Sequence, residues 1–145
     1  MISLMELTPT LLTGAIHGDE RGRLSYNNNF DLSLVRRVYF IENENTSIIR
    51  KWQGHKIEQR WFSAVTGSFK ILLIKIDNWE QPAKGLKAQE YVIKSDTFDI
   101  LHIPKGYVSS IQALEKPSKL MVMADYLFGE IKDEYRYSKD YFENT

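Results

Sequence analysis

Apolar residues in this chain occur in short runs that polar or turn-forming segments separate. The run at 69–76, FKILLIKI, is nearly all apolar, is too short for a typical helix, and therefore predicts a β-strand. The length of 145 residues, without internal repeats or linkers, predicts one all-β domain spanning 1–145. β-branched and aromatic residues predict further strands at 34–41, 48–56, 58–65, 88–93, 97–103 and 119–127.

Glycine and proline mark turns between these runs. The segment 66–68 (TGS) predicts a hairpin turn, and 104–106 (PKG) and 115–117 (EKP) predict further turns. Strands spaced by roughly 8–12 residues favour a β-sandwich or barrel. We expect 48–76 to contribute three adjacent strands of an antiparallel barrel. The charged and aromatic tail, 129–145, predicts either a short helix or a packed extension.

Charge and composition exclude several classes of function. Lys+Arg and Asp+Glu both number 19, whereas a nucleic-acid binder usually carries a basic excess. The chain has no cysteine, which excludes disulfides, thiol catalysis and cysteine-bound zinc. Its N-terminus lacks the basic start and apolar run of a signal peptide, and no window is apolar enough to span a membrane. We therefore expect a cytoplasmic protein.

The predicted strand at 48–56 carries the most distinctive polar pattern. Gln53 and His55 are two positions apart, so they share one face of a strand, and Gln59 is expected to extend that face. A polar inward face usually lines a cavity that binds something. His55 is then either a general base with a pKa near neutrality or a strand histidine that is exposed or bonded to a backbone carbonyl.

A metal site is not expected from this pattern. Histidine and glutamate together can hold iron, manganese or zinc, but His55 and Glu58 point to opposite faces of a regular strand. His102, in the segment DILHIP, is interpreted as a residue at the edge of the core. These scattered ligands are too few for a metal centre.

Basic and tyrosine side chains offer two further kinds of contact. The planar fork of arginine suits phosphate oxygens, although strand alternation places about half of a basic run on a solvated face. Tyr107 and Tyr126 lie beside turn or strand-end signals, and a tyrosine across a pocket from His55 can act as a general acid. Most tyrosines in such a chain are core or rim residues. The basic residues between 36 and 60 are Arg36, Arg37, Arg50, Lys51, Lys56 and Arg60.

Taken in order, several segments resemble the sugar-nucleotide branch of the cupin superfamily. This branch includes dTDP-4-dehydrorhamnose 3,5-epimerases and dTDP-4-keto-6-deoxyglucose 3,4-ketoisomerases. The longest likeness is RKWQGHKIEQ at 50–59, which is similar to the RGxHAHKxxEQ-type strand of these enzymes. The other segments are GDERGRL at 18–24, RRVYFI at 36–41, IPKGYVSSI at 103–111, similar to the strand entrance IPxGxxH, and ADYLF at 124–128.

The resemblance implies a cupin-type antiparallel jelly-roll β-barrel with a short C-terminal extension, assembled as a homodimer. It also implies a nucleotide-diphosphate sugar as the bound partner and chemistry that needs no cofactor. In that chemistry a base removes a proton beside a keto group, donors stabilise the enediolate, and an acid returns a proton. Such reactions serve the synthesis of sugars for cell-surface polysaccharides.

The resemblance also implies roles for individual residues. His55 is expected to be the base, and Tyr126 or Tyr107 the acid. Arg50 is expected to anchor the diphosphate, and Gln53 and Gln59 to contact sugar oxygens. Arg37 and Lys56 are the remaining residues expected to bind the substrate.

Two departures from the motifs leave the function open. The first histidine of the HAH segment falls on Gln53, and an amide cannot accept a proton at physiological pH. The histidine that often follows IPxGxx falls on Val108 or Ser109. One hypothesis is an isomerase or epimerase of a nucleotide-linked 4-keto-6-deoxysugar. The other is a catalytically degenerate cupin that only binds a sugar nucleotide.

Overall fold

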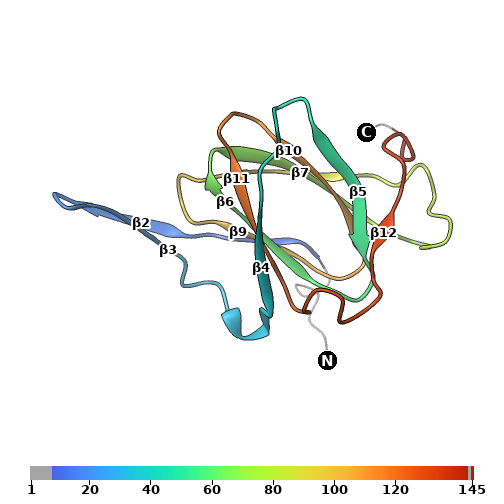
Figure 1. The fold of residues 1–145 in the computed structure, drawn as a ribbon, viewed down its shortest axis with the longest axis horizontal. Helices are drawn as coiled ribbons and strands as arrows, with labels where there is room; N and C mark the ends of the chain where they lie inside the picture. The colour runs from blue at the N-terminus through green and yellow to red at the C-terminus, as the bar shows by residue number, and fades with distance from the viewer. Residues whose placement is uncertain (1–7, 144) are drawn as a thin grey trace.

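The computed structural model describes residues 8–143 and 145, and its regular structure is almost all β-strand (Figure 1). The prediction of an all-β chain is confirmed, and no helix in this described part is long and apolar enough to cross a membrane. The start of the N-terminal segment, 1–7, lies outside the described residues. The elements are β1 (Thr10–Leu12), β2 (Ala15–Asp19), β3 (Gly22–Tyr26), the 3-10 helix η1 (Leu32–Leu34), β4 (Arg37–Ile41), β5 (Ile49–His55), β6 (Arg60–Thr66), β7 (Ser68–Lys75), β8 (Gln89–Lys94), β9 (Ile100–Ile103), β10 (Tyr107–Ala113), β11 (Lys119–Ala124) and β12 (Tyr135–Arg136).

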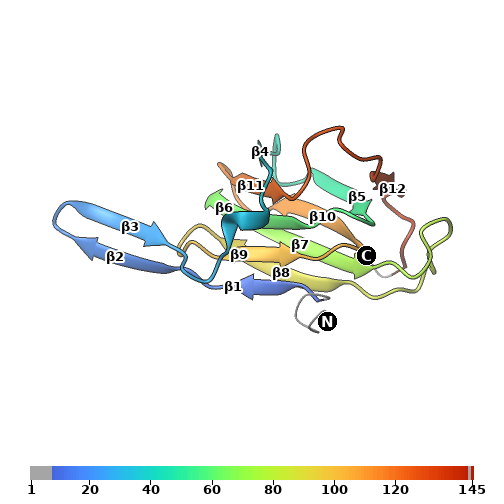
Figure 2. The same cartoon turned by 90° about the horizontal axis from the view of Figure 1, so that it is seen from below.

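Two five-stranded sheets pack against each other, in the orders β1-β9-β6-β11-β4 and β12-β5-β10-β7-β8. Every strand pair in the described residues is antiparallel. The main core lies between the sheets and draws side chains from both, among them Phe62, Leu120, Phe69 and Leu73. Figures 1 and 2 show the sheets from two directions at right angles, with the β2–β3 hairpin projecting away from them.

The apolar run at 69–76 forms β7, which lies between β10 and β8. Ile71 and Leu73 face the main core, whereas Ile74 packs on the other side of the sheet with Trp52 and Phe142. Burial on both faces explains why this strand is apolar at nearly every position rather than at alternate ones.

The predicted turn at 66–68 exists, but it is not a hairpin turn. Gly67 has a φ of 72°, and a Cβ at this position would lie 2.1 Å from the Ser118 hydroxyl oxygen, so glycine is required. The chain turns here and crosses from β6 in one sheet to β7 in the other. The prediction of three adjacent strands from 48–76 is wrong for the same reason, because β5 and β7 flank β10 while β6 lies in the facing sheet.

The hydrophobic pattern misses two parts of the fold. β10 lies at the centre of its sheet, but Ser109, Ser110 and Gln112 interrupt its apolar residues. β2 and β3 pair only with each other in the described residues, and β3 is exposed along its whole length. Such a hairpin has no buried face, so it has no apolar periodicity by which it could be recognised.

The C-terminal tail is a packed extension rather than a helix. Tyr137 and Trp52 exchange backbone hydrogen bonds of 3.1 and 3.4 Å, which continue the pairing of β12 with β5. Phe142 is 3% exposed and packs edge-on against Trp52, with ring centres 5.4 Å apart. The tail therefore covers the outer face of β5, whose inner face carries Gln53 and His55.

Candidate active site

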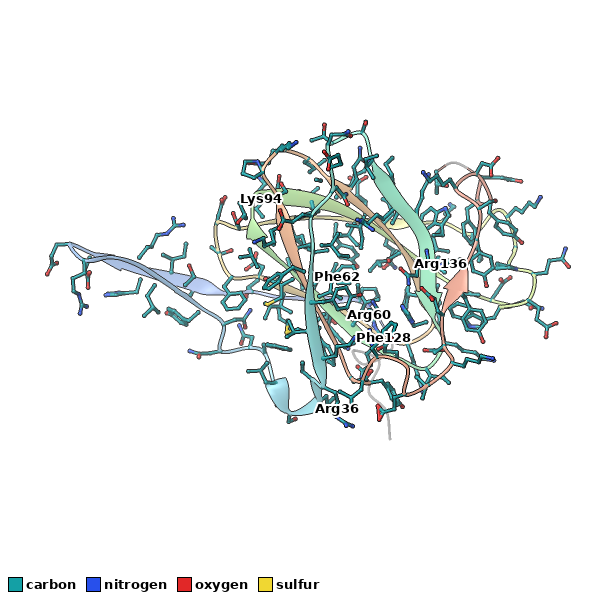
Figure 3. The ribbon with its side chains drawn as sticks, in the orientation of Figure 1. Arg36, Arg60, Phe62, Lys94, Phe128 and Arg136 are labelled. Atoms are coloured by element: carbon teal, nitrogen blue, oxygen red, sulfur yellow. The ribbon has the colours of Figure 1, made fainter. Side chains whose placement is uncertain are left out.

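The inward faces of three strands change from apolar to polar toward one end of the molecule. On β6, Phe62 belongs to the core, and Arg60 lies two residues earlier on the same face (Figure 3). On β4, Tyr39 packs beside the core and Arg37 lies two residues before it. Because alternate residues of a strand share a face, these side chains line one hollow. Gln53 and His55 of β5 complete it.

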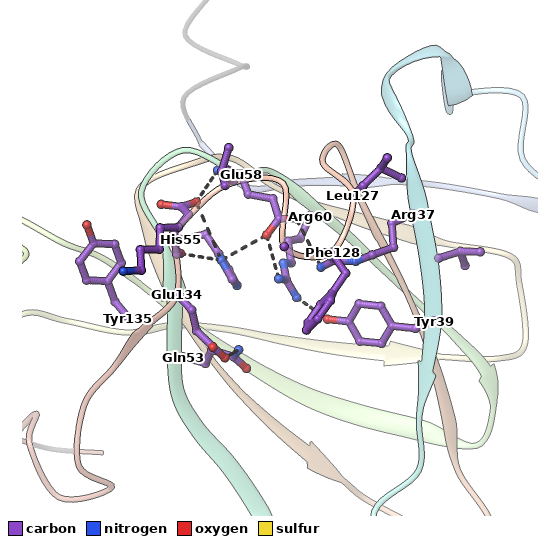
Figure 4. A pocket seen from close by; sticks show the side chains of 15 residues that line it. Arg37, Tyr39, Gln53, His55, Glu58, Arg60, Leu127, Phe128, Glu134 and Tyr135 are labelled. Atoms are coloured by element: carbon purple, nitrogen blue, oxygen red, sulfur yellow. Dashed lines mark hydrogen bonds and ion pairs between the residues drawn. The ribbon is translucent and has the colours of Figure 1, made fainter.

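This hollow has a volume of about 950 Å³, within the range of small-molecule sites (Figure 4). Residues 127–129 and 131–134, between β11 and β12, form its remaining wall together with Tyr135 of β12. A much smaller hollow shares Gln53, His55, Glu58 and Arg60 with it and adds Tyr107 and Ser109. Figure 4 shows His55, Gln53 and Glu134 on one side of the pocket and Arg37, Tyr39 and Phe128 on the other.

Asp133 shapes the backbone next to His55. β5 ends at His55, and the buried Asp133 carboxylate accepts the backbone N–H groups of the next residues, Lys56 at 2.9 Å, Ile57 at 2.9 Å and Glu58 at 2.8 Å. The resulting bend brings Glu58 Oε2 to 3.2 Å from His55 Nδ1. The expectation that these two residues point to opposite faces is therefore wrong, because the regular strand stops between them.

The contacts and burial of His55 determine which ring nitrogen carries a proton and whether the imidazole is charged. Nδ1 lies 3.0 Å from the backbone oxygen of Asp133, which can only accept, so Nδ1 carries the proton and Nε2 keeps the lone pair. Burial, followed by the positive charge of Arg60, lowers the pKa of His55 to about 4, while the charges of Asp133 and Glu134 partly oppose this change. The imidazole is thus neutral at physiological pH, and the expected pKa near neutrality is corrected downward.

Two arginines contact the Glu58 carboxylate, and one of them also contacts Tyr39. Arg37 Nη2 lies 3.3 Å from Oε1, and Arg60 Nη2 lies 2.9 Å from Oε2. Arg60 Nη1 also donates to the Tyr39 hydroxyl. One carboxylate therefore faces two guanidinium groups, and because His55 is neutral this group of side chains keeps a net positive charge. That charge suits an anionic ligand.

His55, Glu58 and Asp133 also stand close enough to hold a metal ion, with one ligand atom from each within 4.8 Å of the others. Their donors are already engaged, since Glu58 pairs with both arginines and Asp133 accepts backbone N–H groups. The near ring nitrogen of His55 carries a proton. A divalent cation would have to displace these partners and sit beside guanidinium groups, so the donor set does not fit a metal centre.

The structure brings several of the expected site residues together. Arg37, Gln53 and His55 line the large pocket. Tyr107 lines the small adjoining hollow and stands opposite His55 in the pairing of β10 with β5. Burial, with a smaller contribution from Tyr91, raises the pKa of Tyr107, so its hydroxyl keeps its proton and can donate.

Four expected site residues lie outside the lining of both hollows, namely Arg50, Lys56, Gln59 and Tyr126. Arg50 is exposed and donates from Nε to Asn43 at 2.7 Å. Gln59 is engaged by Asp125 and by His102 Nε2, which lies 2.7 Å from its side-chain oxygen. Lys56 is exposed, and Tyr126 is half-buried.

Several residues that line the pocket have no predicted role from the sequence. Alternation along 37–41 places Tyr39 on the same face as Arg37, and this signal could have identified it. Asp133 and Glu134 lie in the charged tail, where no sequence signal indicates pairing with β5. The residues concerned are Tyr39, Glu58, Phe128, Asp133 and Glu134.

Solved structures share this fold. A histidine-to-asparagine variant of the 3,4-ketoisomerase QdtA from Thermoanaerobacterium thermosaccharolyticum, in complex with TDP-4-keto-6-deoxyglucose, matches with a TM-score of 0.68 at 22% identity, over 92% of this chain and 90% of that one. A dTDP sugar isomerase from Desulfovibrio desulfuricans G20 matches with a TM-score of 0.71 at 17% identity, over 94% and 89%. The rmlC epimerase of Mycobacterium tuberculosis matches with a TM-score of 0.70 at 14% identity, over 96% and 72%.

These likenesses confirm the cupin-type jelly-roll fold. The comparison with curated protein sequences finds no significant match. A family model described as "FdtA: WxcM-like, C-terminal" matches residues 6–145. Because this match spans nearly the whole sequence, the chain belongs to the FdtA family of WxcM-like, C-terminal domains.

Proposed function

We propose that this protein is an isomerase of a nucleotide-linked 4-keto-6-deoxysugar and that it moves the keto group between neighbouring carbons. The observation that carries the proposal is a neutral His55 in a large pocket that also presents the guanidinium groups of Arg37 and Arg60. The solved 3,4-ketoisomerase structures support ketoisomerisation over epimerisation, because the chain covers 90% of the QdtA variant but only 72% of the Mycobacterium tuberculosis epimerase.

Each part of the pocket has a role in this reaction. The unprotonated Nε2 of His55 removes the proton of the carbon beside the ketone, and the C–H electron pair forms the double bond of an enediolate. Arg60 and the Tyr39 hydroxyl stabilise the oxygen on which negative charge develops. Arg37 binds the diphosphate of the nucleotide, and Phe128, an exposed residue of the pocket lining, offers a ring surface to the base.

Product analysis tests this function. The protein is incubated in deuterated water with 4-keto-6-deoxy sugars linked to TDP or UDP, and each mixture is followed by NMR against a control without protein. We expect a 3-keto product that carries deuterium at the former carbonyl carbon. A product with inverted configuration instead would make the protein an epimerase, and absence of both product and deuterium in every sugar would refute the isomerase.

Binding without catalysis is the second candidate, and Gln53 is the observation that favours it. The amide replaces a histidine of the motif and removes one titratable group from the inner face of β5. A protein of this kind would bind TDP sugars in calorimetry, introduce no deuterium, and lose only affinity when His55 is replaced.

Homodimer formation is part of the same proposal. The β2–β3 hairpin leaves Leu24 59% and Tyr26 38% exposed, and the edge strand β4 leaves Val38 57% and Phe40 56% exposed. Exposed strand edges with apolar side chains are commonly covered by a partner chain. Sedimentation should show a dimer at micromolar concentration, and a monomer throughout that range would contradict it.

A further inference from the structure

A carboxylate, Glu134, lies beside Gln53 in the pocket. Its amide Nε2 donates to Glu134 Oε1 at 2.5 Å, and both residues line the pocket that also contains His55. Pairing of β12 with β5 places Arg136 opposite Gln53, so Glu134 comes from the chain immediately before that pair. A carboxylate from the tail thus meets the position at which the motif has a histidine (Figure 4).

The contacts of Glu134 orient its carboxylate without enclosing it. Oε1 accepts a second hydrogen bond, from Arg136 Nη2 at 2.6 Å. Among residues 8–143 and 145, no donor contacts Oε2. The side chain is 53% exposed, so a ligand in the pocket can reach the second oxygen. One oxygen is therefore held by protein donors, and the other is available to a substrate hydroxyl.

Ketoisomerisation moves two protons, one between neighbouring carbons and one between their oxygens. If His55 carries the carbon proton, a second group has to take the proton of the hydroxyl and deliver it to the former carbonyl oxygen. Amides cannot do this, so Gln53 is excluded, whereas a carboxylate can. Glu134 is the carboxylate that contacts Gln53 on this wall of the pocket.

We propose that Glu134 is the second proton-transfer group of this site and that it relays the hydroxyl proton of the sugar from one oxygen to the next. This inference rests on the proposed isomerase function. After His55 has formed the enediolate, the Glu134 carboxylate takes the proton of the neighbouring hydroxyl, whose O–H electron pair becomes the new C=O bond. The C=C electron pair takes the proton held by His55 at the former carbonyl carbon, and Glu134 gives its proton to the former carbonyl oxygen. The atoms and electrons balance within the sugar, so no oxidant or reductant is consumed.

The test is the Glu134→Gln variant, because it keeps the size and one acceptor oxygen but cannot carry a proton. Deuterium entry at the carbon beside the ketone and formation of the 3-keto product are measured together by NMR with TDP-4-keto-6-deoxyglucose. We expect product formation to fall about 100-fold or more, the usual contribution of a proton-transfer group, while deuterium still enters at that carbon. Loss of exchange and product in the same proportion, or retention of both, would overturn the relay.

Matched variants separate this role from damage to the fold. Glu90→Gln makes the same change at an exposed residue of β8 that lines neither hollow, and it should leave product formation unchanged. Adding Gln53→His to Glu134→Gln should recover product, because it returns a titratable group to this wall. No recovery would argue against the relay. Failure of the isomerase itself is recognised separately, since the wild type would then give neither exchange nor product.

Discussion

The burial of neutral His55 predicts a specific dependence of stability on pH. In the folded protein its pKa falls from the usual 6.5 to about 4. Because the unfolded chain then binds the proton more readily, stability is complete above about pH 6.5 and is lost as the pH falls toward 4. Each unit of pKa difference corresponds to about 1.4 kcal/mol, so the full loss from this histidine is about 3 kcal/mol.

The His55→Gln variant isolates this contribution, because it keeps a hydrogen-bond donor but does not titrate. Urea unfolding of both proteins is measured at several pH values between about 7 and 4, so that the acid sensitivity of the carboxylates cancels in the difference. We expect the stability advantage of the wild type over the variant to shrink by about 3 kcal/mol across this range. A difference that stays constant with pH would refute the assignment of a buried neutral imidazole.

Other side chains give predictions of their own. Replacing Asp133 by alanine leaves the backbone N–H groups of 56–58 without their acceptor. Urea titrations should then show a free energy of unfolding that is lower by about 3 kcal/mol or more. A loss below about 1 kcal/mol would contradict the role of Asp133. Phe142→Ala leaves a cavity beside Trp52 and should lower the free energy of unfolding by about 3 kcal/mol, measured by thermal unfolding. An unchanged unfolding midpoint would show that the tail does not stabilise β5. Phe128 is 90% exposed, so Phe128→Ala should leave the stability of the fold unchanged. In calorimetry the same variant should bind TDP more weakly by about 1–3 kcal/mol. Equal affinity would exclude stacking of Phe128 on the nucleotide base.

Strands with buried apolar faces could be predicted from the sequence, and their neighbours in the sheets could not. The run that forms β7 is recognisable because both of its faces are covered. The hydrophobic pattern does not identify β10, because serine and glutamine interrupt its apolar residues at the centre of the sheet, and only the resemblance at 103–111 indicates a strand entrance there. The crossing at Gly67 depends on packing against Ser118, a contact between residues far apart in the sequence.

In the candidate site, too, the sequence predicts the face of a strand but not the contacts between distant segments. Strand alternation correctly places Gln53 and His55 on one face toward a pocket. It could not supply Asp133 or Glu134, which are 78 residues from His55 and 81 residues from Gln53 in the sequence and reach them through the pairing of β12 with β5. Arg50 was expected to bind phosphate because it begins the motif, but it donates to Asn43 and lines neither hollow.

The most direct test of the central claim, proton transfer by His55, is the rate of deuterium entry into TDP-4-keto-6-deoxyglucose in deuterated water. Wild-type protein and the His55→Asn variant are compared by NMR at concentrations that saturate both with the sugar nucleotide. We expect the wild type to introduce deuterium at the carbon beside the ketone, and the variant to do so at least about 100-fold more slowly while still binding TDP. Equal rates in the two proteins, or no exchange by the wild type, would contradict it.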